Sequence, residues 1–236
     1  GTQHESDRIG RGRLDRRQRW APVAHVGERL GFVDHVGHGT CRWHDGRMES
    51  SHEPLTAFSP DGHEVRWATW DGEADETLTL TWENEGWTAS GTVGRERVQY
   101  VVRLSPTWQV RQFLLFRDLE EPDLWLATDG AAHWGEMNGA HRVELDGCYD
   151  IDLACSPFPR TIPIRRLPLH VGHTADVTVV RIDVDTLDVR AVPMRYTRLD
   201  RQRWRVTDAS TGVVDEFEVD EHGLVVDLPA AFRRLR

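Results

Sequence analysis

Turn dipeptides that separate short alternating segments restrict the fold of this chain more than any other feature. Seven Asp-Gly, Asn-Gly, Thr-Gly or His-Gly pairs occur between residues 61 and 223. Asn-Gly and Asp-Gly supply the positive φ angles that tight hairpin turns need. Between the turns, apolar residues alternate with polar ones, as in Leu78-Thr-Leu80-Thr-Trp82. This period of two is typical of strands that bury one face.

Residues 61–236 are therefore predicted to form one all-β domain. About a dozen strands at this spacing indicate a single strongly curved antiparallel sheet that forms an open or half-closed β-barrel. Helical periodicity is nearly absent from this part of the chain.

Residues 1–60 differ in composition, being rich in Arg, Gly and His and poor in sustained periodicity. We expect a poorly structured N-terminal extension that is disordered or loosely attached. An alternative is that the natural protein begins at Met48 and that residues 1–47 are upstream sequence.

Four possible zinc ligands recur every three residues within this extension, where four nitrogen and sulfur ligands could close a tetrahedral site. Their spacing matches none of the usual finger patterns, and the glycines between them oppose a rigid helix. We therefore interpret the pattern as accidental and expect no metal and no cofactor. The four residues are His35, His38, Cys41 and His44.

Charge and hydropathy limit the possible partners. The net charge of −10 divides into +3 for residues 1–48 and −13 for residues 49–236. An acidic body argues against nucleic acid, since phosphate binding needs a basic face, and also against anionic lipid surfaces. No apolar run approaches the roughly 18 to 20 residues that span a bilayer, and no signal-peptide core is present. The three cysteines fit no disulfide framework, so we expect a cytoplasmic protein.

The densest cluster of unusual residues lies in residues 148–169, with the sequence CYDIDLACSPFPRTIPIRRLPL. Alternation from residue 141 to 153 places Asp150 and Asp152 on the face away from the core, with their Cβ atoms about 7 Å apart. Carboxylates at that separation could perform acid–base chemistry, as in an inverting glycosidase. A solvated face or a salt bridge to arginine is the preferred interpretation, because no nucleophile, metal set or catalytic motif accompanies them.

The second half of the cluster contains three prolines and an arginine pair, Arg165 and Arg166. Prolines cannot donate hydrogen bonds in a sheet, so we expect a stiff crossing or an edge segment, with residues 162–169 extended. In an extended segment the two arginines point to opposite faces, and one of them points towards the core. A buried arginine must meet a carboxylate, a phosphate or a polar headgroup. A structural buried salt bridge and a ligand site both satisfy that need.

Aromatic residues are unusually frequent, with ten tryptophans in the chain. Their apolar bodies and polar tips suit sugar stacking and lipid contact, although filling a large β core is the simpler use for most of them.

The runs from Asp150 to Phe158 and from Pro163 to Leu167 resemble a bacterial family of uncharacterised proteins called putative glycolipid-binding proteins. Arg195 to Leu199 and Glu218 to Pro229 resemble the C-terminal part of that family. The resemblance covers roughly Glu64 to Arg236. Pro159-Arg160 replaces the Thr-Asn pair that members usually carry there. The resemblance implies an open, mostly antiparallel barrel similar to bacterial lipoprotein carriers. It also implies an amphipathic or glycolipid ligand and the ligand-site candidates Asp150, Asp152, Arg165, Arg166, Tyr196 and Arg198.

Three functional hypotheses remain at this point. A binding module would hold an amphipathic ligand in the concavity of the barrel. A lipocalin-like enzyme would use Asp150 or Asp152 as a base, which requires one of them to sit in a pocket with a raised pKa. A structural or partner-binding β domain would have a solidly filled interior.

Overall fold

The computed structural model describes residues 55–94, 98–117 and 121–235, which belong to one compact unit. The expectations for residues 1–54, including the zinc pattern, lie outside the described residues. The predicted division of the chain at residue 60 stays a prediction. Phe58, on the N-terminal side of that division, is only 4% exposed and joins the core.

Sheet A contains nine antiparallel strands in the order β13-β14-β1-β2-β3-β4-β5-β6-β7. Seven of its strands, β1 to β7, follow each other along the chain as antiparallel neighbours, and the predicted turns Asp71-Gly72 and Asp129-Gly130 join two of these pairs. The strands are β1 His63–Thr69, β2 Asp75–Glu83, β3 Gly86–Val93, β4 Val98–Leu104, β5 Val110–Phe116, β6 Leu124–Thr128, β7 Trp134–Glu136, β13 Asp227–Leu228 and β14 Phe232–Arg234.

Sheet B contains five strands in the order β12-β11-β10-β9-β8. Its pairs are antiparallel except β8 with β9, which run parallel. The strands are β8 Asp150–Leu153, β9 Thr174–Ile182, β10 Val189–Arg198, β11 Arg203–Asp208 and β12 Val214–Glu218.

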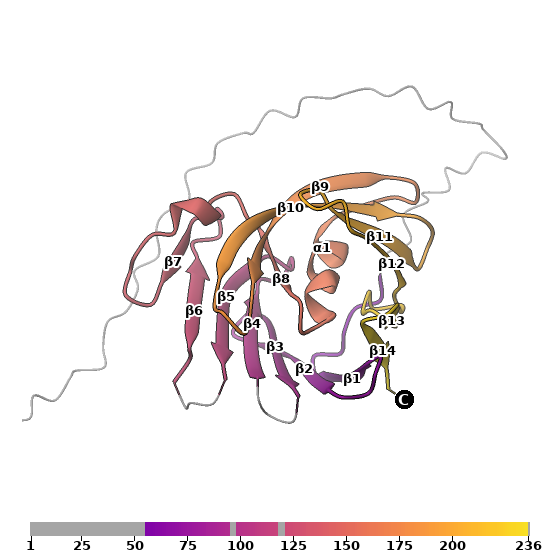
Figure 1. Ribbon diagram of the computed structural model, residues 1–236, viewed down its shortest axis with the longest axis horizontal. Coiled ribbons are helices and arrows are strands. Elements are labelled where there is room, and N and C mark those ends of the chain that lie inside the picture. Colours follow the sequence, from indigo (N-terminus) through magenta and orange to yellow (C-terminus); the bar gives the residue numbers. More distant parts are fainter. Residues whose placement is uncertain (1–54, 95–97, 118–120, 236) are drawn as a thin grey trace, which may run out of the picture. The chain divides into compact units, whose positions relative to one another are not determined.

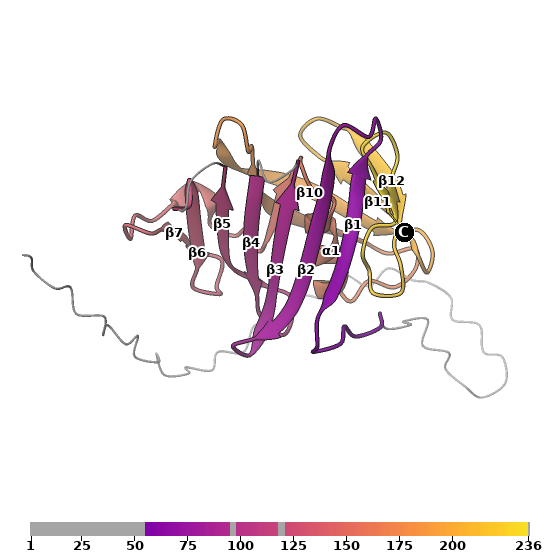
Figure 2. The ribbon, with the colours of Figure 1, turned by 90° about the horizontal axis from the view of Figure 1, so that it is seen from below.

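The two sheets curl towards each other, which confirms the predicted all-β half-barrel fold (Figures 1 and 2). The strand hydrogen bonds fall into two sets rather than one continuous sheet. An isolated bridge between Val219 and Val225 and a hydrogen bond from Trp67 Nε1 to the Val225 carbonyl (2.8 Å) link the end of sheet B to sheet A.

The short helix α1, Thr161–Arg166, lies in the concavity of the two sheets (Figure 1). Ile162 and Ile164 are at most 2% exposed and join the core between the sheets. The prediction that residues 162–169 are extended was therefore wrong. Pro163 lies in the first turn of α1, where a helix needs no N–H donor, and Pro168 follows its end.

Two further 3-10 turns flank β8: η1 Val143–Leu145 and η2 Phe158–Arg160, which continues directly into α1. Of residues 141–153, which were predicted to alternate along a strand, only Asp150–Leu153 form a strand, and all four of these residues are buried. Val143 and Tyr149, which that alternation assigned to the core, are 69% and 41% exposed.

A buried polar cluster connects sheet A to the loop that leads into α1. Tyr100 lies across Gly91, where a Cβ atom would be only 2.2 Å from its ring. Its hydroxyl donates to Glu76 Oε1 (2.5 Å), and Ser156 Oγ donates to the same oxygen (2.8 Å). Burial raises the pKa of Glu76 to about 7, and these two hydrogen bonds oppose that rise.

Within the described ranges, the helices are too short and too polar to cross a bilayer. The same residues contain no group of three or more His, Cys, Asp and Glu side chains that could hold a metal ion.

Candidate functional site

Asp150 forms a buried salt bridge with Arg166. The Arg166 Nη2 and Nε atoms donate to the two carboxylate oxygens of Asp150 at 2.5 and 3.0 Å. The side chain of Asp150 is 0% exposed. Burial raises the pKa of Asp150, while the hydrogen bonds and charge of Arg166 lower it. The prediction that Asp150 faces away from the core was wrong.

Asp152 is also buried, at 8% exposure, and is held by Arg181. Arg181 Nε donates to Asp152 (2.9 Å), and its Nη1 donates to Asp208 (2.6 Å). The reason lies in β8, whose four residues are all buried because it pairs in parallel with β9 and is covered by the turn and helix that follow. Alternation predicts exposure only for a strand with one free face.

Tyr196 and Arg198 belong to β10 and are 2% and 3% exposed. Burial raises the pKa of Tyr196 well above its ordinary value, against the charge of Arg160. Arg198 donates to the carbonyl oxygens of Leu169 (2.9 Å) and Arg201 (3.1 Å), which ties the chain after α1 to the β10–β11 turn. Both side chains are parts of the packed interior of sheet B.

Arg165 has a different environment from these residues. Its Nη1 donates to the carbonyl oxygens of His222 (2.5 Å) and Thr56 (3.2 Å), and its buried Nε has no partner. Within the described part of the chain, no carboxylate lies at salt-bridge distance from its guanidinium. Burial lowers the pKa of Arg165 to about 10, opposed by the more distant charge of Asp220.

Two aromatic rings take the place of a carboxylate partner. The guanidinium carbon of Arg165 lies 4.6 Å from the ring centre of Phe58 and 4.5 Å from a ring centre of Trp108. Both distances fall within the range of cation–π attraction. Trp108 lies in the β4–β5 turn and has a φ angle of 66°, which is uncommon for a bulky residue. Its ring contacts the Arg165 guanidinium from this turn.

These rings belong to a continuous series that we call the aromatic row: Trp82, Trp87, Trp108, Phe58 and His222. Successive ring centres in that order are 5.2, 6.2, 5.6 and 4.9 Å apart. Trp82 is 41% exposed, whereas Phe58 and Trp108 are at most 4% exposed. The aromatic row therefore leads from solvent to the Arg165 guanidinium.

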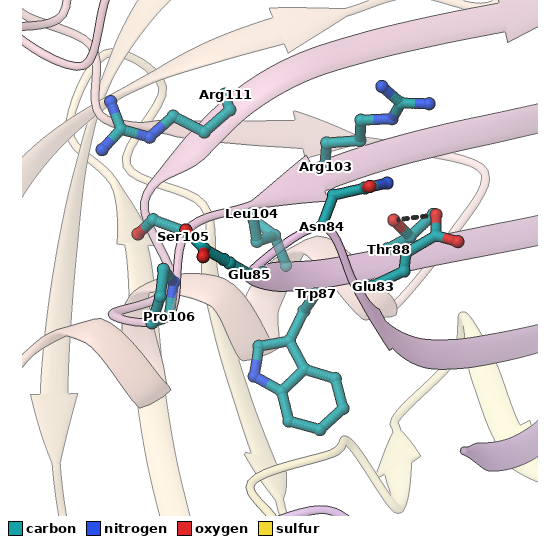
Figure 3. Close-up of a pocket in the computed structure, with 11 residues that line it drawn as sticks. Glu83, Asn84, Glu85, Trp87, Thr88, Arg103, Leu104, Ser105, Pro106 and Arg111 are labelled. Carbon is teal, nitrogen blue, oxygen red and sulfur yellow. Dashed lines mark hydrogen bonds between the residues drawn. The ribbon is translucent and has the colours of Figure 1, made fainter. Parts of the chain in front are cut away.

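A pocket of about 370 Å³ adjoins the aromatic row at the ends of β2, β3, β4 and β5. Arg103 and Arg111 extend on one side of the sheet, while the Trp87 indole points to the other (Figure 3). The lining residues are Glu83, Asn84, Glu85, Gly86, Trp87, Thr88, Arg103, Leu104, Ser105, Pro106 and Arg111.

The structure thus separates the six predicted ligand residues into two groups. Asp150, Asp152, Arg166, Tyr196 and Arg198 are embedded in salt bridges, backbone contacts or packing. Arg165 alone of the six meets the aromatic row. Sequence reasoning missed Phe58, Trp108 and His222, and the only available signal was the high number of tryptophans.

Comparisons with known proteins place these observations in context. The sequence model of a family described as "Putative glycolipid-binding" matches residues 64–234. Among solved structures, the crystal structure of a DUF1089 family protein from Pseudomonas aeruginosa is similar, with 27% identity and a TM-score of 0.57. The similarity covers 80% of this chain and 100% of that one. A search of curated proteins finds no match.

Proposed function

Because the chain belongs to the family described as putative glycolipid-binding, we propose that it binds the polar headgroup of an amphipathic molecule, such as a glycolipid, at Arg165 and the aromatic row. The observation that carries the proposal is the environment of Arg165. This partly buried cation lies against two aromatic rings and has no carboxylate partner among the described residues.

The neighbouring Arg166 differs from Arg165 in having a carboxylate partner. Arg166 holds Asp150 with two hydrogen bonds, so its charge is compensated inside the protein. Arg165 has lost part of its hydration, and the more distant charge of Asp220 offsets that loss only in part. A ligand oxygen that accepts from the free guanidinium nitrogens would recover that loss, since hydrogen bonds to charged groups contribute about 1.5–3 kcal/mol.

The aromatic row supplies the second half of the recognition. Tryptophan rings have an apolar face and a polar edge, which suits a ligand with both sugar and hydrocarbon parts. Trp82 is exposed at the outer end of the row, and Trp87 lies directly beside it. A ligand that stacks on these two rings would place its headgroup towards Arg165.

The position of α1 supports a site at the mouth of the concavity rather than deep inside it. Ile162, Ile164 and Phe158 fill the space between the sheets and are at most 2% exposed. An acyl chain would have to displace these packed side chains to lie in the concavity. We therefore assign the ligand to the aromatic row, with its chain directed towards solvent or a membrane surface.

The enzyme hypothesis finds no support in the two aspartates. It requires Asp150 or Asp152 to be available in a pocket as a base. Arg166 engages the first with two hydrogen bonds, and Arg181 engages the second at 2.9 Å. Neither carboxylate lines the pocket beside the aromatic row.

The test is a vesicle-binding experiment with matched arginine variants. Phosphatidylcholine vesicles are prepared with and without a glycosyl diacylglycerol, and binding is measured by co-sedimentation. Wild type and Arg66→Gln, a control at an exposed arginine on β1, are expected to prefer the glycolipid vesicles. Arg165→Gln and Trp108→Ala are expected to lose that preference. Equal binding of wild type to both vesicles, with no co-purifying lipid in native mass spectrometry, would contradict the proposal.

A further inference from the structure

The pocket beside the aromatic row carries charges of both signs that do not neutralise each other. In the described ranges, no salt bridge joins Arg103 or Arg111 to Glu83 or Glu85, although all four side chains line the pocket. Glu83 accepts only from the Thr88 hydroxyl at 2.7 Å. All four side chains are exposed, and Arg111 Nη2 also donates to Gln109 Oε1 (3.5 Å), so the guanidinium donors and carboxylate acceptors around the pocket keep most of their hydrogen-bonding capacity free.

The walls of the pocket are held in place by two close contacts. Arg111 packs over Gly130 so tightly that a Cβ atom there would lie 1.5 Å from its Nη1 atom. On the opposite side, Gly86 approaches β4, and a Cβ atom there would lie 2.3 Å from the Leu104 carbonyl oxygen. The β2–β3 turn between them is a two-residue hairpin with φ angles of 51° and 60° at Asn84 and Glu85. The backbone around the pocket is therefore fixed before a ligand arrives, while its exposed charged side chains can adjust to the ligand.

This arrangement selects for a particular kind of ligand. An anion in the pocket would be repelled by Glu83 and Glu85, and a cation would be repelled by Arg103 and Arg111. A sugar hydroxyl donates to a carboxylate and accepts from a guanidinium at the same time, so it satisfies both. The volume of about 370 Å³ lies in the range of small-molecule sites, about 300–1,000 Å³.

We propose that this pocket, on the face of sheet A from which Arg103 and Arg111 extend, is a subsite for an uncharged, hydroxyl-rich group such as a sugar ring. The inference rests on the proposed function in that the sugar belongs to the same headgroup. The β4–β5 turn connects the two regions, since Ser105 and Pro106 line the pocket and Trp108 contacts Arg165. A headgroup with more than one sugar could lie across this turn.

The experiment follows the arginine side chains directly by NMR. The Nε–Hε signals of Arg103 and Arg111 are assigned with the variants Arg103→Gln and Arg111→Gln. A panel of free, neutral disaccharides of gluco, galacto and manno configuration is then titrated, with inorganic phosphate as the anionic probe. At least one disaccharide is expected to move both signals. Each of the two variants is expected to weaken that sugar about tenfold, which corresponds to about 1.4 kcal/mol.

The outcomes separate this inference from the proposed function. If no disaccharide moves the two signals, or if phosphate moves them and the sugars do not, the sugar subsite is wrong. Arg165→Gln is expected to keep the sugar response while losing its preference for glycolipid vesicles. Vesicle binding without a sugar response would overturn the subsite alone, and a sugar response without vesicle binding would overturn the headgroup proposal alone.

Discussion

Replacement of Glu76 by glutamine is expected to change how the stability of the protein depends on pH. Glu76 is 1% exposed, and its Oε2 atom is buried without a hydrogen-bond partner. Burial raises its pKa from the ordinary value of 4.5 to about 7. The folded protein therefore holds a proton between these two pH values that the unfolded chain releases.

The sign of the effect follows from this difference in proton binding. Stability falls with pH wherever the folded state binds more protons than the unfolded state. Wild type should thus lose stability as pH rises from 4.5 to about 7, and the loss should be complete above that range. A pKa difference of about 2.5 corresponds to about 3 kcal/mol, at about 1.4 kcal/mol for each pH unit.

Glutamine keeps an oxygen for the Tyr100 and Ser156 hydroxyls but cannot ionise. The stability difference between Glu76→Gln and wild type should therefore shift by about 3 kcal/mol in favour of the variant from below pH 4.5 to above pH 7. Urea unfolding across this range measures the shift, whatever constant offset the substitution adds. Glu64→Gln, on the exposed face of β1, is the control and should show no such shift. A Glu76→Gln difference that stays constant with pH would refute the reasoning.

Three further predictions concern stability and are measured by chemical denaturation. Arg166→Gln should lower the free energy of unfolding by about 3–5 kcal/mol, because it leaves the buried Asp150 carboxylate without its partner; an effect no larger than that of Arg165→Gln would contradict this assignment. Gly91→Ala should destabilise by about 1–3 kcal/mol, because the added Cβ would lie 2.2 Å from the Tyr100 ring; an unchanged midpoint would show that the ring can move aside. Burial, assisted by the charge of His222, lowers the pKa of His63, so the contribution of His63 to stability should fall as pH drops below 6.5 and His63→Gln should become more stable relative to wild type over that range; a difference between the two proteins that stays constant with pH would exclude this contribution.

Strand alternation and turn chemistry carried most of the information about the fold. The hairpins from β1 to β7 follow from residues near each other in sequence, such as the turns at Asp71-Gly72 and Asp129-Gly130. These local signals do not reveal which strands pair across the chain. The parallel pairing of β8 with β9 and the division into two sheets depend on contacts between distant segments.

The central stretch shows where local reasoning fails. Prolines in this stretch are compatible with a sheet edge, but Pro159 and Pro163 lie in the first turns of η2 and α1, where proline is equally compatible. Asp150 and Asp152 alternate with apolar residues along β8. This alternation would expose both carboxylates only if one face of β8 were free. Helix and sheet cover both faces, and the arginines that make this burial possible come from α1 and β9.

The candidate site was predictable only in part. The arginine pair was recognised, together with the need of a buried guanidinium for a partner. The sequence could not show which arginine forms the salt bridge and which contacts the aromatic row. Opposite directions are expected only in an extended segment, whereas the helix α1 directs adjacent side chains about 100° apart. The residues that distinguish Arg165, namely Phe58, Trp108 and His222, each lie more than 50 residues from it along the chain. Only the folded structure brings them together.

The central claim is that Arg166 holds the fold while the adjacent Arg165 is available to a ligand. Co-sedimentation of folded Arg165→Gln and wild type with glycosyl diacylglycerol vesicles tests it most directly, with circular dichroism and urea unfolding on the same samples. The claim predicts that Arg165→Gln unfolds close to wild type, within about 1 kcal/mol, yet loses its preference for these vesicles. A variant that keeps the wild-type preference, or one that loses it only because it no longer folds, would contradict the claim.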